Sequence, residues 1–232
     1  MKAALEYNEK GCLLWSLDCP GAFARGETRE EAVAKLPADV EAFCRWAGWK
    51  LPVGAVEIVE EKYQPDLQVE DADSDLLFES ERRPLGREEY ETLRALVMKS
   101  AADFDVLYAA VLDPDMPLGK ERKTFYGEYP NTARTMYGHT NSVTGYYVGE
   151  MGAETEPLPG FYENRLSGIT ALETIPDFLN LPVIEGSYGE LWSVRKVLRR
   201  FLWHDRIHAR AMYRRAELLW GDRIPDPFRF QK

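Results

Sequence analysis

Histidine and cysteine are scarce in this sequence, which contains three residues of each among 232. The cysteines, Cys12, Cys19 and Cys44, are too few for a disulfide framework and lack the paired spacing of a zinc site. No segment approaches the roughly 20 consecutive apolar residues of a membrane span. The N-terminus has neither the apolar core nor the cleavage site of a secretory signal. We therefore expect a cytoplasmic protein whose cysteines are reduced and structural.

A net positive charge is also lacking, because 39 acidic residues outnumber 29 basic ones and give a formal net charge of −10. Proteins that bind nucleic acids carry a basic surface, and only residues 192–221 are locally basic, so a nucleic-acid partner is not expected. The apolar share of 45% and the charged share of 29% are typical of a globular protein. The length fits one large domain or two modest ones.

Residues 1–64 have the pattern of a small α+β domain with the order β-β-β-α-β. Short apolar runs at residues 3–7, 12–17 and 22–25 are separated by turn residues and predict three strands. Thr28 and Glu31 have the spacing of a capping box, which predicts the start of a helix. Residues 53–63 predict the last strand, and the polar, acidic stretch that follows predicts a linker over residues 65–86 that buries little.

The run DCPGAFARGETREEA, residues 18–32, follows a predicted hairpin around Gly11 and resembles the HicB-like antitoxin fold. The resemblance covers about residues 1–64 and implies that α+β fold. It also implies a role in protein interaction, because a toxin partner covers the sheet in antitoxins of this type. No DNA-binding helical module follows here, so antitoxin activity is not expected.

From residue 87 to residue 232 the sequence predicts an all-α four-helix bundle. Apolar residues recur at helical spacing over residues 87–111, 132–151, 166–181 and 192–221, with a charged connection at 120–130. The third of these helices is expected to end or bend near Pro176. Ser187 or Ser193 is expected to cap the last helix, and Gly221 to end it. Metal sites in bundles are built from facing side chains in the core.

The three histidines fall on two of these predicted helices. His204 and His208 are four residues apart, so one helix presents both imidazoles on the same face, a spacing that suits two ligands of one metal ion. His139 lies in the second helix. At about 100° per residue, the opposite side of the last helix is basic and is expected to face solvent; it carries Arg195, Arg199, Arg206 and Arg210.

A histidine in the second helix followed by WSVRKVLRRFLWHDRIHARAM in the fourth resembles the DinB/YfiT-like family of metal-binding four-helix bundles. The resemblance covers about residues 87–221. It implies a divalent metal ion held by His139, His204 and His208, with Asp205 as the acidic residue that precedes the last ligand. The family includes thiol-dependent S-transferases, a mycothiol-dependent isomerase, metal-dependent hydrolases and many members without an established activity. Its bundles often pair, so the resemblance implies a homodimer, while the sequence itself leaves the oligomeric state open.

Three neutral imidazoles leave coordination positions open, which suits catalysis better than a structural role. Zinc or nickel is expected as the ion, with a low-molecular-weight thiol as a second cofactor. A bound ion activates water or holds a thiol as thiolate, so the expected function is a metal-dependent hydrolase or thiol-dependent S-transferase acting on a small molecule. The alternative is a non-enzymatic protein with a structural or vestigial metal site and a HicB-like interaction domain. Metal affinity is expected to fall as the pH drops through about 6.5.

Several further residues of the predicted bundle have two interpretations each. Arg200 leans inward one turn before His204 and is a candidate to bind an anionic substrate or thiol; the alternative is an ion pair with an acidic residue of another helix. Asp205 invites comparison with the carboxylate base of His-Glu-x-x-His proteases, but its side chain is shorter, so a place behind the ligands or on the surface is expected. Pocket-lining and core roles both remain open for Tyr146, Tyr147 and Trp203.

Overall fold

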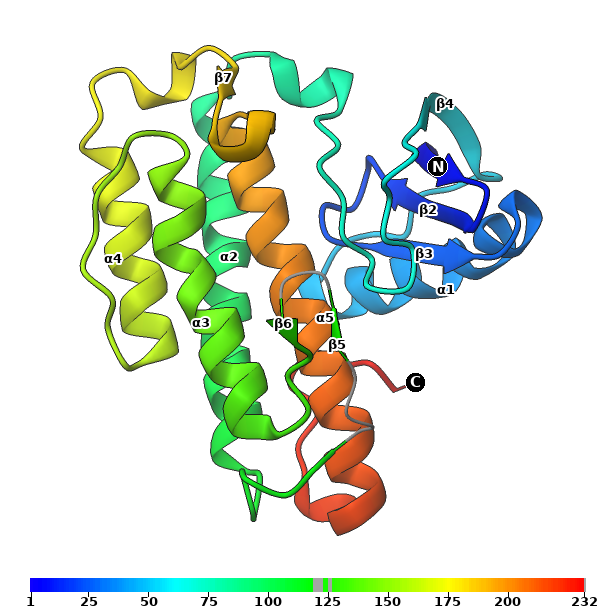
Figure 1. Cartoon of the computed structure of the whole chain (residues 1–232), viewed down its shortest axis with the longest axis vertical. Coiled ribbons are helices and arrows are strands. Elements are labelled where there is room, and N and C mark those ends of the chain that lie inside the picture. Colours follow the sequence, from blue (N-terminus) through cyan, green and yellow to red (C-terminus); the bar gives the residue numbers. More distant parts are fainter. Residues whose placement is uncertain (119–122, 125–126, 232) are drawn as a thin grey trace.

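The computed structural model describes residues 1–118, 123–124 and 127–231. It combines a small mixed sheet of four strands, formed near the N-terminus, with helices that dominate the C-terminal part (Figure 1). The α+β class expected from the sequence is confirmed, as is the concentration of helices after residue 87. The charged connection expected at residues 120–130 lies partly outside the described residues.

The N-terminal strands and helix follow the predicted order. They are β1 (Lys2–Asn8), β2 (Gly11–Ser16), β3 (Phe23–Gly26), α1 (Arg29–Ala47) and β4 (Glu57–Tyr63). The sheet has the order β3-β2-β1-β4, in which β1 pairs antiparallel with β2 and parallel with β4. A parallel pair needs a long crossover connection, which α1 supplies. The predicted last strand starts later than expected, at Glu57.

The start of α1 is stabilised by the two residues that predicted it. Thr28 Oγ1 accepts a hydrogen bond from the backbone N–H of Glu31 at 3.2 Å. The Glu31 carboxylate accepts a hydrogen bond from the N–H of Glu27 at 2.8 Å. In a regular capping box it would accept from the N–H of the N-cap residue, Thr28, which is one residue later. Gly48, with φ 71°, ends the helix in the left-handed conformation that glycine adopts most readily.

Four long helices form the bundle: α2 (Arg87–Ala109), α3 (Ala133–Gly149), α4 (Phe161–Glu173) and α5 (Val194–Trp220). Helices α4 and α5 each pack against both α2 and α3. Ser193 caps α5, since its hydroxyl accepts from the N–H of Lys196. The third helix ends near Pro176, as expected, but it starts earlier than residue 166, at Phe161; Asp177 beyond its end has a positive φ of 54°.

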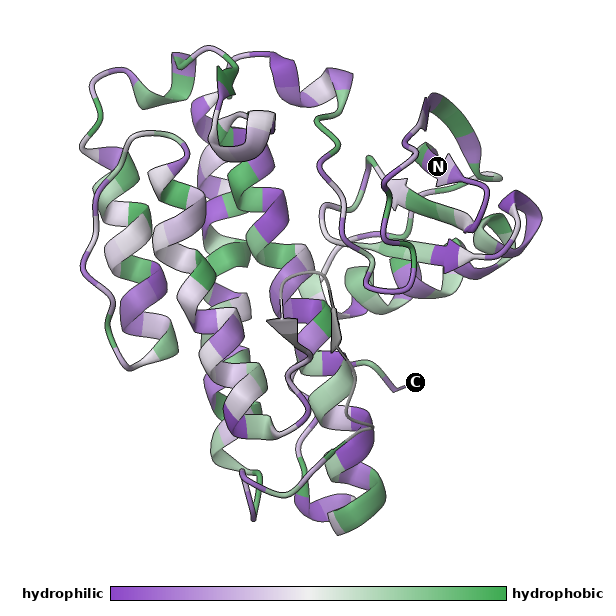
Figure 2. Cartoon of the chain, viewed as in Figure 1, coloured by the Kyte–Doolittle hydropathy of each residue, from purple (hydrophilic) through white to green (hydrophobic). Residues whose placement is uncertain are grey.

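Short elements connect these helices. They are η1 (Glu79–Arg82), β5 (Lys123–Thr124), β6 (Gly127–Glu128), η2 (Phe178–Asn180), β7 (Ile184–Glu185), η3 (Ser187–Gly189), β8 (Leu191–Trp192) and η4 (Gly221–Arg223). Figure 2 shows hydrophilic and hydrophobic residues alternating along the long helices, as expected for helices that bury one face. Within the described ranges, no helix is long and apolar enough to cross a membrane.

The segment expected to be an exposed acidic linker, residues 65–86, is partly buried. Its apolar residues Leu67, Ala72, Leu76 and Phe78 form one cluster with the face of the sheet that α1 leaves open and with Trp203 of α5. That cluster also contains Ala4, Leu13 and Trp15. Both faces of β1 and β2 are therefore covered by the chain itself, whereas β4 is largely exposed.

The basic side of α5 was expected to face solvent, and this expectation was wrong. Arg199 and Arg206 are 4% and 2% exposed, because residues 74–81 and α1 pack against them. Arg199 forms an ion pair with Glu81 at 2.5 Å, and Arg210 pairs with Asp39 of α1. Three basic side chains of α5 also donate to consecutive carbonyl oxygens of residues 74–76: Arg200 to Ser74, Lys196 to Asp75, and Arg199 to Leu76.

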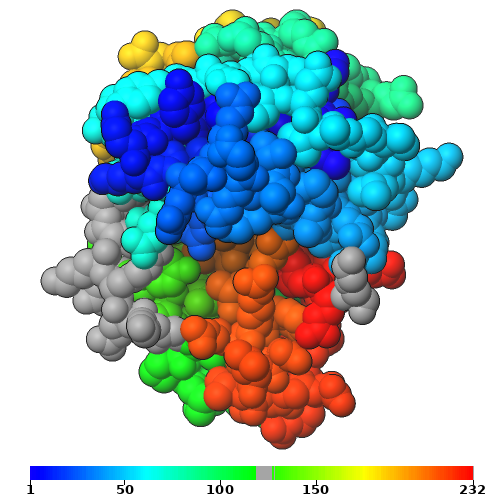
Figure 3. All heavy atoms as spheres, turned by 90° about the vertical axis from the view of Figure 1, so that its right-hand side faces the viewer, coloured from blue at the N-terminus to red at the C-terminus, as the bar shows by residue number. Residues whose placement is uncertain are grey.

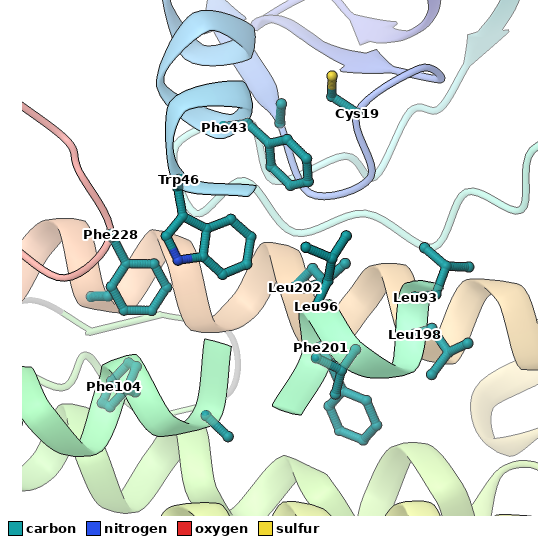
Figure 4. Close-up of a cluster of buried hydrophobic side chains, with 14 of the residues drawn as sticks. Cys19, Phe43, Trp46, Leu93, Leu96, Phe104, Leu198, Phe201, Leu202 and Phe228 are labelled. Carbon is teal, nitrogen blue, oxygen red and sulfur yellow. The ribbon is translucent and has the colours of Figure 1, made fainter. Parts of the chain in front are cut away.

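A single apolar core continues from the sheet into the bundle. Phe43 and Trp46 of α1 point toward α5 and toward Phe228 of the C-terminal segment (Figure 4). Trp46 stacks on Phe228 with ring centroids 5.7 Å apart and donates from Nε1 to Asp103 of α2 at 2.6 Å. The N-terminal part is therefore fixed against α2 and α5 by both apolar and polar contacts.

Candidate metal centre

The three histidines meet between α3 and α5. His204 and His208 lie one turn apart on α5, and His139 faces them from α3, which packs alongside. One ring nitrogen from each residue lies within 4.8 Å of the other two. In the described part of the chain this is the only group of three or more potential metal ligands. The structure therefore brings together the residues that the sequence had grouped.

The spacing of the imidazoles suits a shared ion. His139 Nε2 and His204 Nε2 are 3.2 Å apart, and the three ring centroids are separated by 4.6–5.0 Å. Two nitrogens that bind one tetrahedral zinc ion at about 2.0–2.1 Å are about 3.4 Å apart. The same 3.2 Å separation also permits a direct N–H···N hydrogen bond when one ring is protonated at Nε2.

All three imidazoles are held in the neutral form that binds metals. His204 and His208 are each 6% exposed, and His139 is half-buried. Burial lowers the pKa of His208 to about 3, and the neighbouring His139 adds to the effect. The pKa of His204 lies well below its ordinary value, mainly because of burial and secondly because of the charges of the other two histidines. Burial also lowers the pKa of His139.

Two ring nitrogens of the group have no hydrogen-bond partner among the described residues: Nδ1 of His204 and Nδ1 of His208. Buried polar atoms are nearly always paired, so an orphaned nitrogen indicates an interaction still to be made. In His204 the nitrogen that faces His139 is Nε2, so an ion bound there would leave Nδ1 as the N–H donor of the neutral ring. The donor set therefore fits an ion such as zinc or nickel.

Asp205 does not point toward the histidines. Its two carboxylate oxygens accept from the guanidinium of Arg165 on α4, both at 2.9 Å, and neither side chain is exposed. The carboxylate is fully engaged inside the bundle, which agrees with the expectation that Asp205 is not a protease-like base. Of the two expected places, the surface position is wrong and the place behind the ligands fits. Sequence reasoning also missed Arg165, although an arginine within an otherwise apolar helix face needs a partner.

Arg200 lies close to the centre and already has partners. It is 6% exposed, and its Nη1 donates to the carbonyl oxygen of Ser74. Its guanidinium is 4.0 Å from the carboxylate of Glu190, in the loop before α5, and 5.3 Å from the ring centroid of Tyr147. Its Nε has no hydrogen-bond partner among the described residues. The anion-binding role remains a prediction.

The histidines and Arg200 open onto a cleft of about 850 Å³. In Figure 3 the N-terminal residues overhang α5, and the cleft runs between them. Both parts of the chain line it, with Phe23, Arg25 and Asp73 from the N-terminal side and Tyr146, Tyr147 and Trp203 from the bundle. Tyr147 and Trp203 are also core residues, only 2% and 4% exposed. The contribution of residues 21–73 was not expected from the sequence.

No protein-family model, curated protein or solved structure matches the chain. The resemblances to HicB-like and DinB-like proteins therefore rest on the sequence motifs alone.

Proposed function

We propose that the chain binds one divalent metal ion through His139, His204 and His208 and uses it to act on a small molecule in the adjoining cleft. The observation that carries this proposal is the convergence of three neutral imidazoles, two of them almost fully buried, on a cleft of about 850 Å³. Cavities of this size are typical of small-molecule sites. The resemblance of α3 and α5 to DinB-like bundles supports the same assignment.

An ion bound by these histidines would lower the pKa of a water ligand or hold a small thiol as thiolate. The chain's own residues provide the surroundings. Tyr147 and Trp203 restrict the access of bulk water, and Arg200 provides a positive charge next to His204. The Arg165–Asp205 pair joins α4 to α5 in the turn between the two α5 ligands and so holds them in place.

A catalytic role is favoured over a structural one by the number of ligands. Structural zinc sites are closed by four protein ligands, whereas catalytic sites keep a position open. The described residues supply three histidines and no fourth ligand to the group, and the group adjoins the cleft. The non-enzymatic alternative would place a partner on the sheet, but α1 and residues 67–78 already cover the two faces of β1 and β2 and leave β4 as the exposed strand.

Metal analysis of protein purified without a histidine tag tests the binding step. We expect up to one zinc or nickel ion per chain, and strongly reduced occupancy in His139→Ala, His204→Ala and His208→Ala. Arg195→Ala serves as a control, since Arg195 lies on the same helix but pairs with Glu89 away from the cleft. Full occupancy in the triple alanine variant would disprove the site.

Cobalt substitution separates catalytic from structural binding. The visible spectrum of cobalt reports its ligands, so an open position should make the spectrum respond to an added small thiol. A site that binds cobalt with an invariant spectrum at millimolar thiol would reject the thiol-dependent version. Hydrolytic activity against ester and amide substrates would then be the remaining enzymatic version to measure.

A further inference from the structure

Two of the three cysteines lie next to each other, although 25 residues separate them in the sequence. Cys19 sits in the turn between β2 and β3, and Cys44 in the last turn of α1. Their Sγ atoms are 3.6 Å apart, and the residues are 1% and 4% exposed. Cys12 lies elsewhere, with its Sγ 3.4 Å from the carbonyl oxygen of Thr28.

We propose that Cys19 and Cys44 form a dithiol pair that is converted to a disulfide by a small peroxide. A disulfide requires the two sulfurs to approach from 3.6 Å by about 1.5 Å. Cys19 lies outside regular secondary structure, in a turn closed by a hydrogen bond from Ser16 N–H to the carbonyl oxygen of Ala22. The backbone of Cys19 is held by hydrogen bonds to Ser16 and Ala22, so rotation of the two cysteine side chains must supply much of this approach.

The surroundings of the pair favour redox chemistry over metal binding. The pair has no third ligand close enough to form a metal-binding group within the described residues, where the histidines form the only such group. The guanidinium of Arg206, 2% exposed, lies within electrostatic range of both sulfurs and also forms a 4.0 Å ion pair with Asp39. A nearby cation stabilises a thiolate.

Burial acts in the opposite direction, because it raises the pKa of the Cys19 thiol. At neutral pH the Cys19 thiol is therefore protonated, and oxidation is slow compared with that of an activated cysteine. Cys44 is the more exposed of the two and the better first target. A small, uncharged oxidant such as hydrogen peroxide suits a buried site of this kind.

The reaction balances with one peroxide molecule. The thiolate of Cys44 attacks one peroxide oxygen and the O–O bond breaks, giving a sulfenic acid and a hydroxide that takes the thiol proton to become water. The Cys19 sulfur then attacks the Cys44 sulfur, the S–O bond breaks, and the hydroxide leaves with the Cys19 proton as a second water. The two thiols lose two electrons, and the peroxide gains them.

The bond would connect two elements that adjoin the cleft. The turn that holds Cys19 also contains Gly21, and α1 contributes Ala42; both residues line the cleft. Oxidation therefore acts on the N-terminal wall, opposite the histidines. The chemistry of the pair does not depend on the proposed metal, and its test can fail or succeed separately.

The full-length protein is treated with increasing hydrogen peroxide, unfolded in excess alkylating reagent, and measured by intact mass spectrometry. We expect two of the three thiols to escape alkylation, with a mass decrease of two hydrogens before alkylation is counted. Peptide mapping without reductant should link the peptides that contain Cys19 and Cys44. Cys12→Ser should behave as wild type, whereas Cys19→Ser and Cys44→Ser should yield no internal link.

Three results would overturn the proposal: all three thiols remain alkylatable, the link involves Cys12, or Cys44 proceeds to sulfinic acid without a link. The peptide map of the wild-type protein decides among them by itself. A cysteine variant that fails to fold therefore does not prevent the test.

Discussion

Arg165 and Asp205 form a bidentate ion pair in the interior of the bundle, with both contacts at 2.9 Å and no exposed surface on either side chain. The guanidinium carbon of Arg165 also lies 3.9 Å from the ring centroid of Phe201. The pair joins α4 to the part of α5 that carries His204 and His208. The charges thus fix the position of the metal-binding helix from behind.

Breaking this pair should destabilise the protein strongly. Asp205→Ala leaves the Arg165 charge buried without a partner, which typically costs about 3–5 kcal/mol. Replacing both residues, as in Arg165→Met with Asp205→Leu, removes both charges and should recover most of that loss. Urea unfolding of the single and double variants measures the difference. Equal stability of Asp205→Ala and wild type would show that the pair contributes nothing.

The pH dependence of metal binding should follow unfolding rather than histidine titration at about 6.5. The folded protein lowers the pKa of His208 to about 3, so protons do not compete effectively for this nitrogen while the fold persists. A lowered pKa means that the neutral histidines favour folding above about 6.5 and that this contribution is lost as the pH falls toward 3.

We therefore expect metal release and loss of helical circular dichroism to coincide as the pH is lowered below about 6.5. Cobalt absorbance and far-ultraviolet circular dichroism, recorded on the same samples, measure the two events. Metal release near pH 6.5 with unchanged helicity would show that the histidines titrate freely in the folded state.

Arg200→Ala should weaken small anionic ligands or thiols without removing the ion. Loss of one hydrogen bond to a charged group typically costs about 1.5–3 kcal/mol, which is roughly a tenfold to hundredfold loss of affinity. Ligand titration into the cobalt-substituted protein gives the affinities. Arg195→Ala, on the same helix but outside the cleft, should bind like wild type; an equal loss in both variants would contradict a specific role for Arg200.

Gly21→Ala should disturb the contact between the N-terminal part and α5. A Cβ at Gly21 would meet Cβ of Leu202 and the backbone N of Trp203 at 3.0 Å, and its φ is +94°. Gly54→Ala is the matched control, because Gly54 has a φ of +105° with no heavy atom within 4 Å of the added Cβ. Beyond the strain shared by both variants, we expect the contact to cost about 1–3 kcal/mol in urea unfolding. Equal losses would rule out a tight approach at Gly21.

The histidine group could be anticipated because its determinants are local. The four-residue spacing of His204 and His208 fixes a common helix face, and a bundle leaves few helices for His139 to face. Their convergence on one point was predicted by this spacing together with the resemblance to DinB-like bundles, which implies His139 as the third ligand. The metal itself and the reaction remain predictions.

The burial of the basic side of α5 could not be read in the same way. Helical periodicity separates the two sides of a helix. It does not show whether a row of arginines faces solvent or packs against carboxylates that are distant in the sequence. The neutralising groups are remote in sequence: Glu81 precedes Arg199 by 118 positions and Asp39 precedes Arg210 by 171. The contact between Cys19 and Cys44 was missed for the same reason, since it depends on tertiary packing.

The three basic side chains of α5 that hold residues 74–76 bind carbonyl oxygens, and every amino acid carries one. The contacts therefore place few demands on the identity of the side chains at those positions, but strict demands on the length and path of the segment. In divergent sequences of this kind we expect residues 74–76 to vary in type, while insertions there are rejected and positions 196, 199 and 200 stay basic. Related sequences would therefore be recognised by the basic residues of α5 and by the length of the segment that they hold, rather than by the identities of residues 74–76.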